Sequence, residues 1–279
     1  MSGIFQRGIE RVWTVQHQQN SPIHIAGMVL DPNNMKESDP FLFLAEDFFK
    51  KGTFDFHPHR GIETVTYVIE GKLEHQDNKA GRGELGPGDV QWMTAGKGVI
   101  HIEDPAEGET VHSLQLWVNL PREHKMTEPR YQNLRAQDMP VREENGALIR
   151  IFSGSSGGIQ STTKNYVQVT MVEINLEPGA SVAQDLPGEY QGFMYILEGK
   201  GQFGKSKTEA EKGHVLLLEK GEAGQSSEVT ITAKEPLRVL LYAGKPLNEP
   251  IVARGPFVMN TEEEVRQAYR DYMDGKFAE

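Results

Sequence analysis

The feature that most constrains the fold of this chain is the recurrence of short, alternating apolar segments that end in Gly or Pro. These segments have the length of β-strands, are rich in Val, Ile, Thr and Tyr, and are bounded by turn-forming residues. They include ETVTYVIEG, DVQWMTAG, VIHIED, VHSLQLWVNL, ALIRIFSG, YVQVTMVEINL, GFMYILEG, HVLLLEKG, EVTITA and LRVLLYAGK. We therefore predict an all-β protein whose strands form sandwiches or barrels.

Helical periodicity is convincing in one segment, NTEEEVRQAYRDYMDGKF, near the C-terminus. Thr261, or Asn260 before it, can cap this helix, and a Glu lies three residues after each of these positions, as a capping box requires. Gly275 is a suitable stop. The segment predicts a short C-terminal α-helix with an apolar face made of Val265, Ala268, Tyr269 and Tyr272.

An internal repeat relates the two halves of the chain. TYVIEGKLEH (residues 66–75) resembles MYILEGKGQF (residues 194–203) at an offset of 128 residues. GPGDVQWMTAGKG (residues 86–98) resembles EKGHVLLLEKGEA (residues 211–223) at an offset of 125 residues. The repeat predicts two similar antiparallel β-domains in tandem.

The boundary between the two domains is expected near residues 140–165. Turn and linker composition is concentrated there, in MPVREENG and SGSSGG. We assign residues 1–145 to an N-terminal domain. Residues 146–279 are assigned to a C-terminal domain that includes the terminal helix.

Charge and composition exclude several classes of function. The net charge of -11 argues against direct binding of nucleic acid, because phosphates require a surplus of Lys and Arg. The chain has no Cys, which excludes disulfides, iron–sulfur clusters and a Cys nucleophile. The sequence has neither the pattern of a signal peptide nor a long apolar run. We expect a cytoplasmic monomer that binds no membrane.

Two pairs of polar residues in the first half of the chain have the spacing of metal ligands. Side chains two residues apart in a strand point to the same face, so His57 and His59 share a face, as do His101 and Glu103. If the two strands are neighbours inside a barrel, three imidazoles and one carboxylate converge. A single H-x-H pair is often exposed or merely hydrogen-bonded, but the second pair, placed correctly in a repeated β-unit, favours a metal site.

This set of ligands suits a divalent transition metal: Fe, Mn, Ni, Co, Cu or Zn. Four protein ligands on a six-coordinate ion leave two positions for a substrate oxygen and O₂. A tetrahedral structural zinc would have the same four ligands and no open position.

The corresponding positions in the second half favour no metal. The offset of 128 moves the first pair to Asp185 and Pro187, and the offset of 125 moves the second pair to Ser226 and Glu228. One or two oxygen ligands without an imidazole make a poor transition-metal site. We therefore expect the C-terminal domain to be metal-free and structural.

Four segments resemble the pirin family of bicupins: HPHRGIETVTYVIEG, GPGDVQWMTAGKGVIHIE, LQLWVNLPREHKMTEPRYQ and GPFVMNTEEEVRQAYRDY. The resemblance extends from about Pro40 to the C-terminus. It implies two antiparallel cupin β-barrels and one metal of the iron type, first of all Fe(II), in the N-terminal barrel. The residues that match the family's metal ligands are His57, His59, His101 and Glu103.

The pattern common to cupins in general fits less well. Counted back from Gly71, the usual cupin Glu falls at Thr64, and strand alternation turns Glu63 away from the metal. We expect Glu63 to form hydrogen bonds or a salt bridge, with Arg60 as a candidate partner. Glu103 would then supply the carboxylate ligand.

The resemblance implies a quercetin 2,3-dioxygenase-like oxidoreductase that cleaves a flavonol with O₂. Glu103 is the expected general base, and a flat aromatic substrate would need an apolar pocket. Two alternatives stay open: a metal- or redox-sensing regulator that binds a transcription factor or a metabolic enzyme, and a metal-binding cupin with another activity, such as an isomerase. The candidates for the pocket are Phe43, Phe48, Phe56, Met93 and Gln115.

Overall fold

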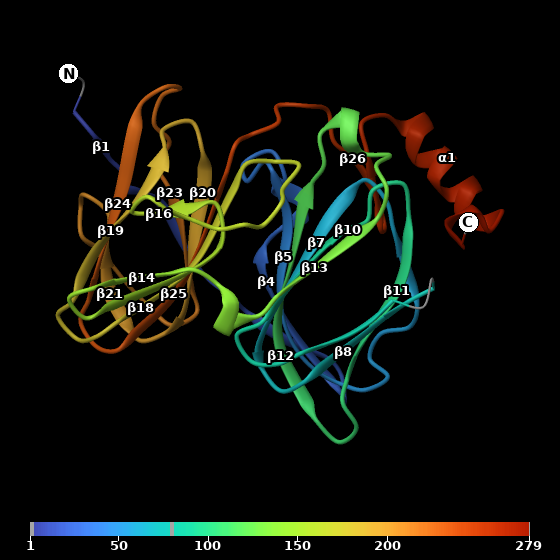
Figure 1. The fold of residues 1–279 in the computed structure, drawn as a ribbon, viewed down its shortest axis with the longest axis horizontal. Helices are drawn as coiled ribbons and strands as arrows, with labels where there is room; N and C mark the ends of the chain where they lie inside the picture. Colours follow the sequence, from blue (N-terminus) through green and yellow to red (C-terminus); the bar gives the residue numbers. More distant parts are fainter. Residues whose placement is uncertain (1–2, 79–80, 279) are drawn as a thin grey trace. The chain divides into compact units, whose positions relative to one another are not determined.

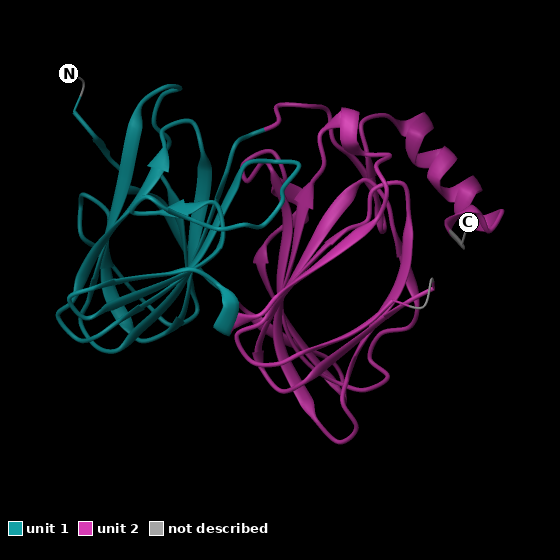
Figure 2. Cartoon of the chain, viewed as in Figure 1, with its two compact units in different colours: residues 1–15, 137–246 teal, residues 16–136, 247–279 magenta. Residues whose placement is uncertain are grey.

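The computed structural model describes residues 3–78 and 81–278, and the chain forms two compact units (Figure 2). Unit 1 consists of residues 1–15 and 137–246, and unit 2 consists of residues 16–136 and 247–279. The predicted division after residue 145 assigned the N-terminal residues to the first domain and the C-terminal helix to the second. The structure has both the other way round. The N-terminal residues join the second repeat and the C-terminal helix joins the first, because strand edges pair by hydrogen bonding and not by order along the chain.

Unit 2 is built mainly from two antiparallel sheets, and a two-stranded hairpin at residues 252–259 is added to them (Figure 1). The larger sheet has the order β13-β10-β7-β12-β5-β4-β3, with bounds β3 (His17–Ser21), β4 (His24–Leu30), β5 (Phe41–Lys50), β7 (Ile62–Glu70), β10 (Val90–Thr94), β12 (Thr110–Asn119) and β13 (Arg130–Leu134). The smaller sheet has the order β6-β11-β8-β9, with bounds β6 (His57–His59), β8 (Leu73–Asp77), β9 (Arg82–Leu85) and β11 (Val99–Pro105). Short 3₁₀ segments are η1 (Pro32–Asn34), η2 (Arg122–His124) and, at the start of unit 1, η3 (Ala136–Asp138).

Unit 1 likewise consists mainly of a larger and a smaller sheet. Its larger sheet has the order β14-β15-β18-β25-β20-β23-β2, with bounds β2 (Ile9–Thr14), β14 (Val141–Glu144), β15 (Ala147–Ser153), β18 (Val169–Leu176), β20 (Gln191–Glu198), β23 (His214–Leu218) and β25 (Leu237–Gly244). Its second sheet contains β1 (Phe5–Gln6), β19 (Ser181–Pro187), β21 (Lys200–Phe203), β22 (Thr208–Glu211) and β24 (Ser226–Ala233). The predicted linker region is folded: β14 and β15 form a hairpin, as do β16 (Ser155–Ser156) and β17 (Ile159–Gln160).

The strand orders of the two larger sheets correspond position by position. β7, β10, β12 and β5 of unit 2 have the places of β20, β23, β25 and β18 in unit 1. The repeated sequence segments therefore fold into equivalent strands, as the repeat predicts. One edge differs in origin: β13 follows β12 along the chain, whereas its counterpart β2 comes from the N-terminus and pairs with β23.

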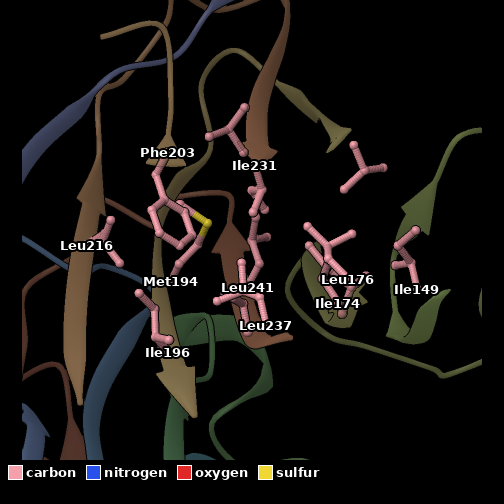
Figure 3. Close-up of a cluster of buried hydrophobic side chains, with 14 of the residues drawn as sticks. Ile149, Ile174, Leu176, Met194, Ile196, Phe203, Leu216, Ile231, Leu237 and Leu241 are labelled. Carbon is pink, nitrogen blue, oxygen red and sulfur yellow. The ribbon is translucent and has the colours of Figure 1, made fainter. Parts of the chain in front are cut away.

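The interior of unit 1 is filled by apolar side chains from both of its sheets. Burial of each Leu, Ile, Met or Phe side chain contributes roughly 1.5–3 kcal/mol to folding. Figure 3 labels ten members of this core: Ile149, Ile174, Leu176, Met194, Ile196, Phe203, Leu216, Ile231, Leu237 and Leu241.

The C-terminal helix forms as predicted and belongs to unit 2. Within the described residues α1 (Glu262–Met273) is the one α-helix, and η4 (Lys276–Ala278) follows it. The Thr261 hydroxyl accepts a hydrogen bond from the backbone of Glu264, whose carboxylate accepts one from the backbone of Thr261, which completes the capping box. Across the described chain, no helix has the length and apolar character that crossing a membrane requires.

Candidate metal centre

The two segments that carry the predicted ligands are neighbouring strands in the smaller sheet of unit 2. β6 pairs with β11 in antiparallel register, so that His57 lies opposite His101 and His59 lies opposite Val99. Directly opposed side chains share a face of the sheet, and alternation brings His59 and Glu103 to that same face. The expectation that these two strands adjoin is confirmed.

Three imidazoles form a compact cluster at this point. Ligand nitrogens of His57, His59 and His101 all lie within 4.8 Å of one another. The ring centroid of His57 is 4.5 Å from that of His101 and 4.9 Å from that of His59. His59 and His101 are only 3% and 1% exposed. The three side chains therefore converge from two adjacent strands in a site that excludes most solvent.

The hydrogen bonding of the cluster leaves ring nitrogens available as ligands. The Nδ1 atom of His57 lies 2.8 Å from the carbonyl oxygen of Asp55, which can only accept, so Nδ1 carries the proton and Nε2 keeps its lone pair. Within the described chain, both ring nitrogens of His59 and of His101 are buried without a hydrogen bond of normal geometry. Each such nitrogen costs roughly 1–3 kcal/mol when unpaired. Converging lone pairs of this kind fit a divalent transition metal.

Burial keeps the imidazoles in the neutral form that binds metals. It lowers the pKa of His59 to about 3, assisted by the adjacent His57 and opposed by the backbone of Pro256. Burial also lowers the pKa of His101 well below its usual value, and the neighbouring imidazoles lower it further. Neutral imidazole is the ligand form of His, so burial favours the state of His59 and His101 that can bind a metal.

Glu103 lies outside the tight group of three imidazoles but lines the same cavity. Its carboxylate contacts Thr66 Oγ1 at 2.7 Å and accepts from Gln115 Nε2 at 3.2 Å. Thr66 Oγ1 is also 2.5 Å from Gln115 Oε1. A hydroxyl carries one proton, so Thr66 donates to one of these two oxygens at a time. Burial is the main cause that raises the pKa of Glu103 to about 7.

A cavity of about 570 Å³ opens beside these groups within unit 2. This volume lies in the range of small-molecule sites. Its lining combines apolar side chains with polar ones, and the polar ones include His57, His59, Glu103 and Gln115. Its aromatic walls are Phe43, Phe49, Phe54 and Trp117.

Comparisons with known proteins agree with this arrangement. Residues 9–118 match the family model described as Pirin, and residues 171–278 match that of the pirin C-terminal cupin domain. A pirin-like protein of Solanum lycopersicum is 44% identical over 244 residues, which cover 87% of this chain and 83% of that protein. The chain belongs to the pirin family.

Two solved structures support the assignment. The protein GK1651 from Geobacillus kaustophilus is 64% identical, with a TM-score of 0.88 over 89% of this pirin and 100% of that chain. A quercetin 2,3-dioxygenase from Acinetobacter baumannii is 30% identical, with a TM-score of 0.85 over 97% of this chain and 98% of its own. This pirin is therefore a bicupin, and each of its units is a jelly roll of paired sheets rather than a closed barrel.

The pocket candidates from the sequence divide into two groups. Phe43 and Gln115 line the cavity of this pirin, as predicted. The other three lie elsewhere: Phe48 stacks on His112, Phe56 is 46% exposed, and Met93 packs in a separate apolar cluster. Strand alternation explains Phe48, because neighbouring residues of β5 point to opposite faces of the sheet.

His75 is a member of the site that sequence reasoning missed. It lies opposite Glu103 on β8, and its ring centroid is 5.3 Å from that of His101. Its side chain is buried, and burial lowers its pKa to about 4. A signal was present, because Leu73, His75 and Asp77 alternate along a strand-length segment and so share a face.

Glu63 has the predicted hydrogen-bonding role but not the predicted partner. It is fully buried and accepts from Thr94 Oγ1 at 2.6 Å. Arg60 does not pair with it and instead donates to Asp271 Oδ2 at 2.7 Å. The prediction of a Glu63–Arg60 pair was wrong because the chain turns at Gly61, whose φ is 80°, and this turn separates the two side chains.

The predicted equivalents of His101 and Glu103 in unit 1 are out of register. On β8, His75 faces Glu103, and its repeat equivalent Phe203 on β21 faces Ile231 of β24. Val229 and Ile231 therefore occupy the two places. The loop from β23 to β24 is longer by three residues than the loop from β10 to β11, which restores the offset of 128. The residues predicted from the offset of 125 were Ser226 and Glu228.

The first ligand pair is displaced by one residue. Across from β24, Gln184 pairs with Val229 and Leu186 pairs with Ser227. These two residues hold the places of His57 and His59, whereas the predicted equivalents were Asp185 and Pro187.

Proposed function

We propose that this pirin is a metal-dependent dioxygenase that cleaves a flat aromatic substrate of the flavonol type with O₂. The observation that carries the proposal is that one aromatic-walled cavity is lined both by imidazoles of the cluster and by the hydrogen-bonded Glu103. The likeness to the quercetin 2,3-dioxygenase of Acinetobacter baumannii over nearly the whole chain supports this substrate class.

In this proposal His57, His59 and His101 hold the metal and Glu103 is the fourth ligand. Fe(II) is the metal that we expect, and Mn, Ni, Co, Cu or Zn suit the same donors. When bound, the metal supplies Lewis acidity toward a substrate oxygen and a centre for O₂ chemistry.

Glu103 is also the proposed general base. One of its carboxylate oxygens accepts the proton of the substrate's enol hydroxyl, which leaves the electron-rich enolate that reacts with O₂. In the metal-free protein burial raises the pKa of Glu103 to about 7, which makes its carboxylate a stronger base than an exposed one. Thr66 and Gln115 hold the carboxylate from two neighbouring strands, so its oxygens keep a fixed direction.

The walls of the cavity orient the substrate and limit the access of water. Trp117 packs edge-on against His59, with ring centroids 5.3 Å apart, and Phe43 packs against Trp117 at the same separation. Aromatic faces at this point suit a planar ligand, since stacking adds about 0.5–1.5 kcal/mol per ring pair beyond burial.

The test is aerobic turnover of a flavonol by metal-loaded protein. Protein loaded with Fe(II) under anaerobic conditions is mixed with quercetin in air-saturated buffer, and the loss of flavonol absorbance and the release of CO are followed. We expect turnover by the wild type and none by His101→Ala, which should also lack metal by elemental analysis. Absence of turnover with each of Fe, Mn, Ni, Co and Cu would overturn the proposal for this substrate class.

A further inference from the structure

Arg60 follows the two histidines of β6 directly, and its side chain points away from them and contacts the C-terminal segment. It is only 5% exposed. Its Nε donates to the carbonyl of Lys97 at 2.6 Å, and its Nη1 lies 2.7 Å from Asp271 Oδ2. Lys97 lies in the turn that leads into β11, so one guanidinium joins the strand of His57 and His59 to the start of the strand of His101.

The backbone of Arg60 is held by the same C-terminal segment. Its N–H donates to the carbonyl of Pro256 at 3.4 Å, and its carbonyl accepts from the N–H of Val258 at 3.1 Å. Val258 belongs to β27 (Phe257–Met259), which pairs with β26 (Val252–Arg254). Since β6 is only three residues long and pairs in register with β11 alone, these two bonds fix the end of the strand next to His59.

Asp271 and Phe277 close over the guanidinium from the end of α1 and from η4. The carbon of the Arg60 guanidinium lies 4.4 Å from the centroid of the Phe277 ring. That ring also packs on Gly98, where an added Cβ would approach it to 2.8 Å. Asp271 accepts further bonds from Gln267 and Lys276. The contacts bury a charged pair with its hydrogen bonds satisfied, and breaking such a pair leaves a buried charge without its partner.

A second buried cation ties the same segments together. Lys125 is 1% exposed and donates to the carbonyls of Gly61 and Val258 and to the side chain of Asn119, at 2.8–2.9 Å. The ammonium group of Lys125 therefore joins Gly61, the residue after Arg60, to β27 as well.

We propose that Arg60 is a positioning residue for the metal centre and that α1 with η4 forms a clasp, through which metal binding and docking of the C-terminal segment stabilise each other. This inference rests on the metal site of the proposed function, but not on its reaction. By linkage, anything that loosens the clasp weakens metal binding, and a bound metal in turn tightens the clasp.

The test measures metal affinity and the protection of α1 in the same variants. Co(II) is titrated into metal-free protein in competition with a chelator, and amide hydrogen exchange of α1 is followed with and without Co(II). The variants are Arg60→Ala, Arg60→Lys and Asp271→Asn. The matched control is Arg254→Ala, which removes an exposed ion pair between β26 and Glu262 on the same helix but touches neither β6 nor the turn before β11.

We expect Arg60→Ala to lower the affinity for Co(II) by about 10–100-fold, the usual effect of losing a residue that orients metal ligands. Asp271→Asn should lower it less, Arg60→Lys should restore part of the loss, and Arg254→Ala should stay within about twofold of the wild type. Co(II) should slow exchange in α1 of the wild type and of Arg254→Ala, but not of Arg60→Ala. If the substitutions merely destabilised the fold, loss of the Arg60–Asp271 pair and loss of the Arg254–Glu262 pair would have the same effect on exchange in α1.

The clasp is refuted if Arg60→Ala binds Co(II) as tightly as the wild type. It is also refuted if Co(II) leaves amide exchange in α1 of the wild type unchanged. If Arg60→Ala does not fold, Asp271→Asn and the wild-type exchange data decide the question. His101→Val separates the two proposals. If it binds Co(II) as tightly as the wild type, the metal site fails and the clasp with it. If Co(II) affinity depends on Arg60 while quercetin is not consumed, the dioxygenase proposal fails and the clasp stands.

Discussion

The two units of this pirin have the same strand order but opposite interiors. In unit 2, Thr66 of β7 lies opposite Gln115 of β12, and this polar pair holds Glu103. In unit 1, the equivalent pair on β20 and β25 is Met194 and Leu241, both fully buried in the apolar core. One fold therefore accommodates either a cavity with polar groups or a packed core at the same place.

The substitution extends across the facing sheet. The places of His59, His75, His101 and Glu103 are taken in unit 1 by Leu186, Phe203, Val229 and Ile231, all members of the apolar core. Each polar residue of unit 2 costs desolvation that its apolar counterpart avoids. The comparison teaches that unit 2 gives up packing energy for a cluster of buried polar side chains, while unit 1 keeps that energy.

The largest effect is expected when a proposed metal ligand of unit 2 is replaced by the core residue that unit 1 has at the same place. His101→Val should lower metal affinity by more than about 100-fold, because one of three imidazoles is lost. Loss of a residue that only orients a ligand usually costs less than this. The metal-free variant should be at least as stable as the wild type, since a buried imidazole with unpaired nitrogens is replaced by an apolar group. Elemental analysis and urea unfolding check both statements, and metal retained at wild-type occupancy would contradict the first.

A smaller change tests the carboxylate alone. Glu103→Gln keeps the size of the side chain and an acceptor for Thr66 but removes the base. We expect flavonol turnover to fall by about 10²–10⁴-fold, the usual contribution of a general base. More metal should remain than in His101→Val, as measured by elemental analysis. Unchanged turnover in this variant would refute the role of Glu103 as base.

The reverse exchange in unit 1 should cost stability instead of activity. Met194→Thr puts the unit 2 residue into the apolar core, where it loses packing and buries a hydroxyl. We expect the free energy of unfolding to fall by about 2–4 kcal/mol in urea titrations. The control Met194→Leu conserves volume and should cost less than about 1.5 kcal/mol. Equal losses in the two variants would mean that polarity at this position is not what separates the units.

Lowering the pH tests the same comparison through the buried imidazoles of unit 2. Burial lowers the pKa of His59 to about 3 and that of His75 to about 4, so between those values and about pH 6.5 the unfolded chain binds more protons. Each of these two histidines should therefore lower the stability of the metal-free protein as the pH drops from 6.5 toward 4, by about 1.4 kcal/mol per pH unit. Glu103, whose pKa is raised to about 7, contributes with the opposite sign over the upper part of this range. His75→Phe, which copies unit 1, should reduce this slope in urea titrations at a series of pH values. A slope identical to the wild type would exclude His75 as a source.

The parts of the site that could be predicted from the sequence are those governed by local periodicity. Alternation with period two placed His57 beside His59 and His101 beside Glu103, and the family resemblance pointed to the same residues. The capping box of α1 was equally local. Pairing between distant strands escaped prediction: β2 occupies an edge beside β23 that any exposed strand could fill, and no residue pattern specifies the choice.

Register in the second repeat escaped for a different physical reason. A loop that is longer by three residues moves every later position of the repeat, and loop length changes freely at little energetic cost. The Thr66–Gln115–Glu103 network could not be predicted either, because its members come from three strands and meet only after the sheets have formed.

The assignment of residues 247–279 to unit 2 has a consequence for the order of events during protein synthesis. Arg60 leaves the ribosome early, whereas Val258 and Asp271, which hold it, are among the last residues to be translated. Domains usually fold from the N-terminus onward during translation. Here the half of the molecule made first waits for its final segment, so we expect the finished polypeptide, and not the nascent one, to acquire the metal.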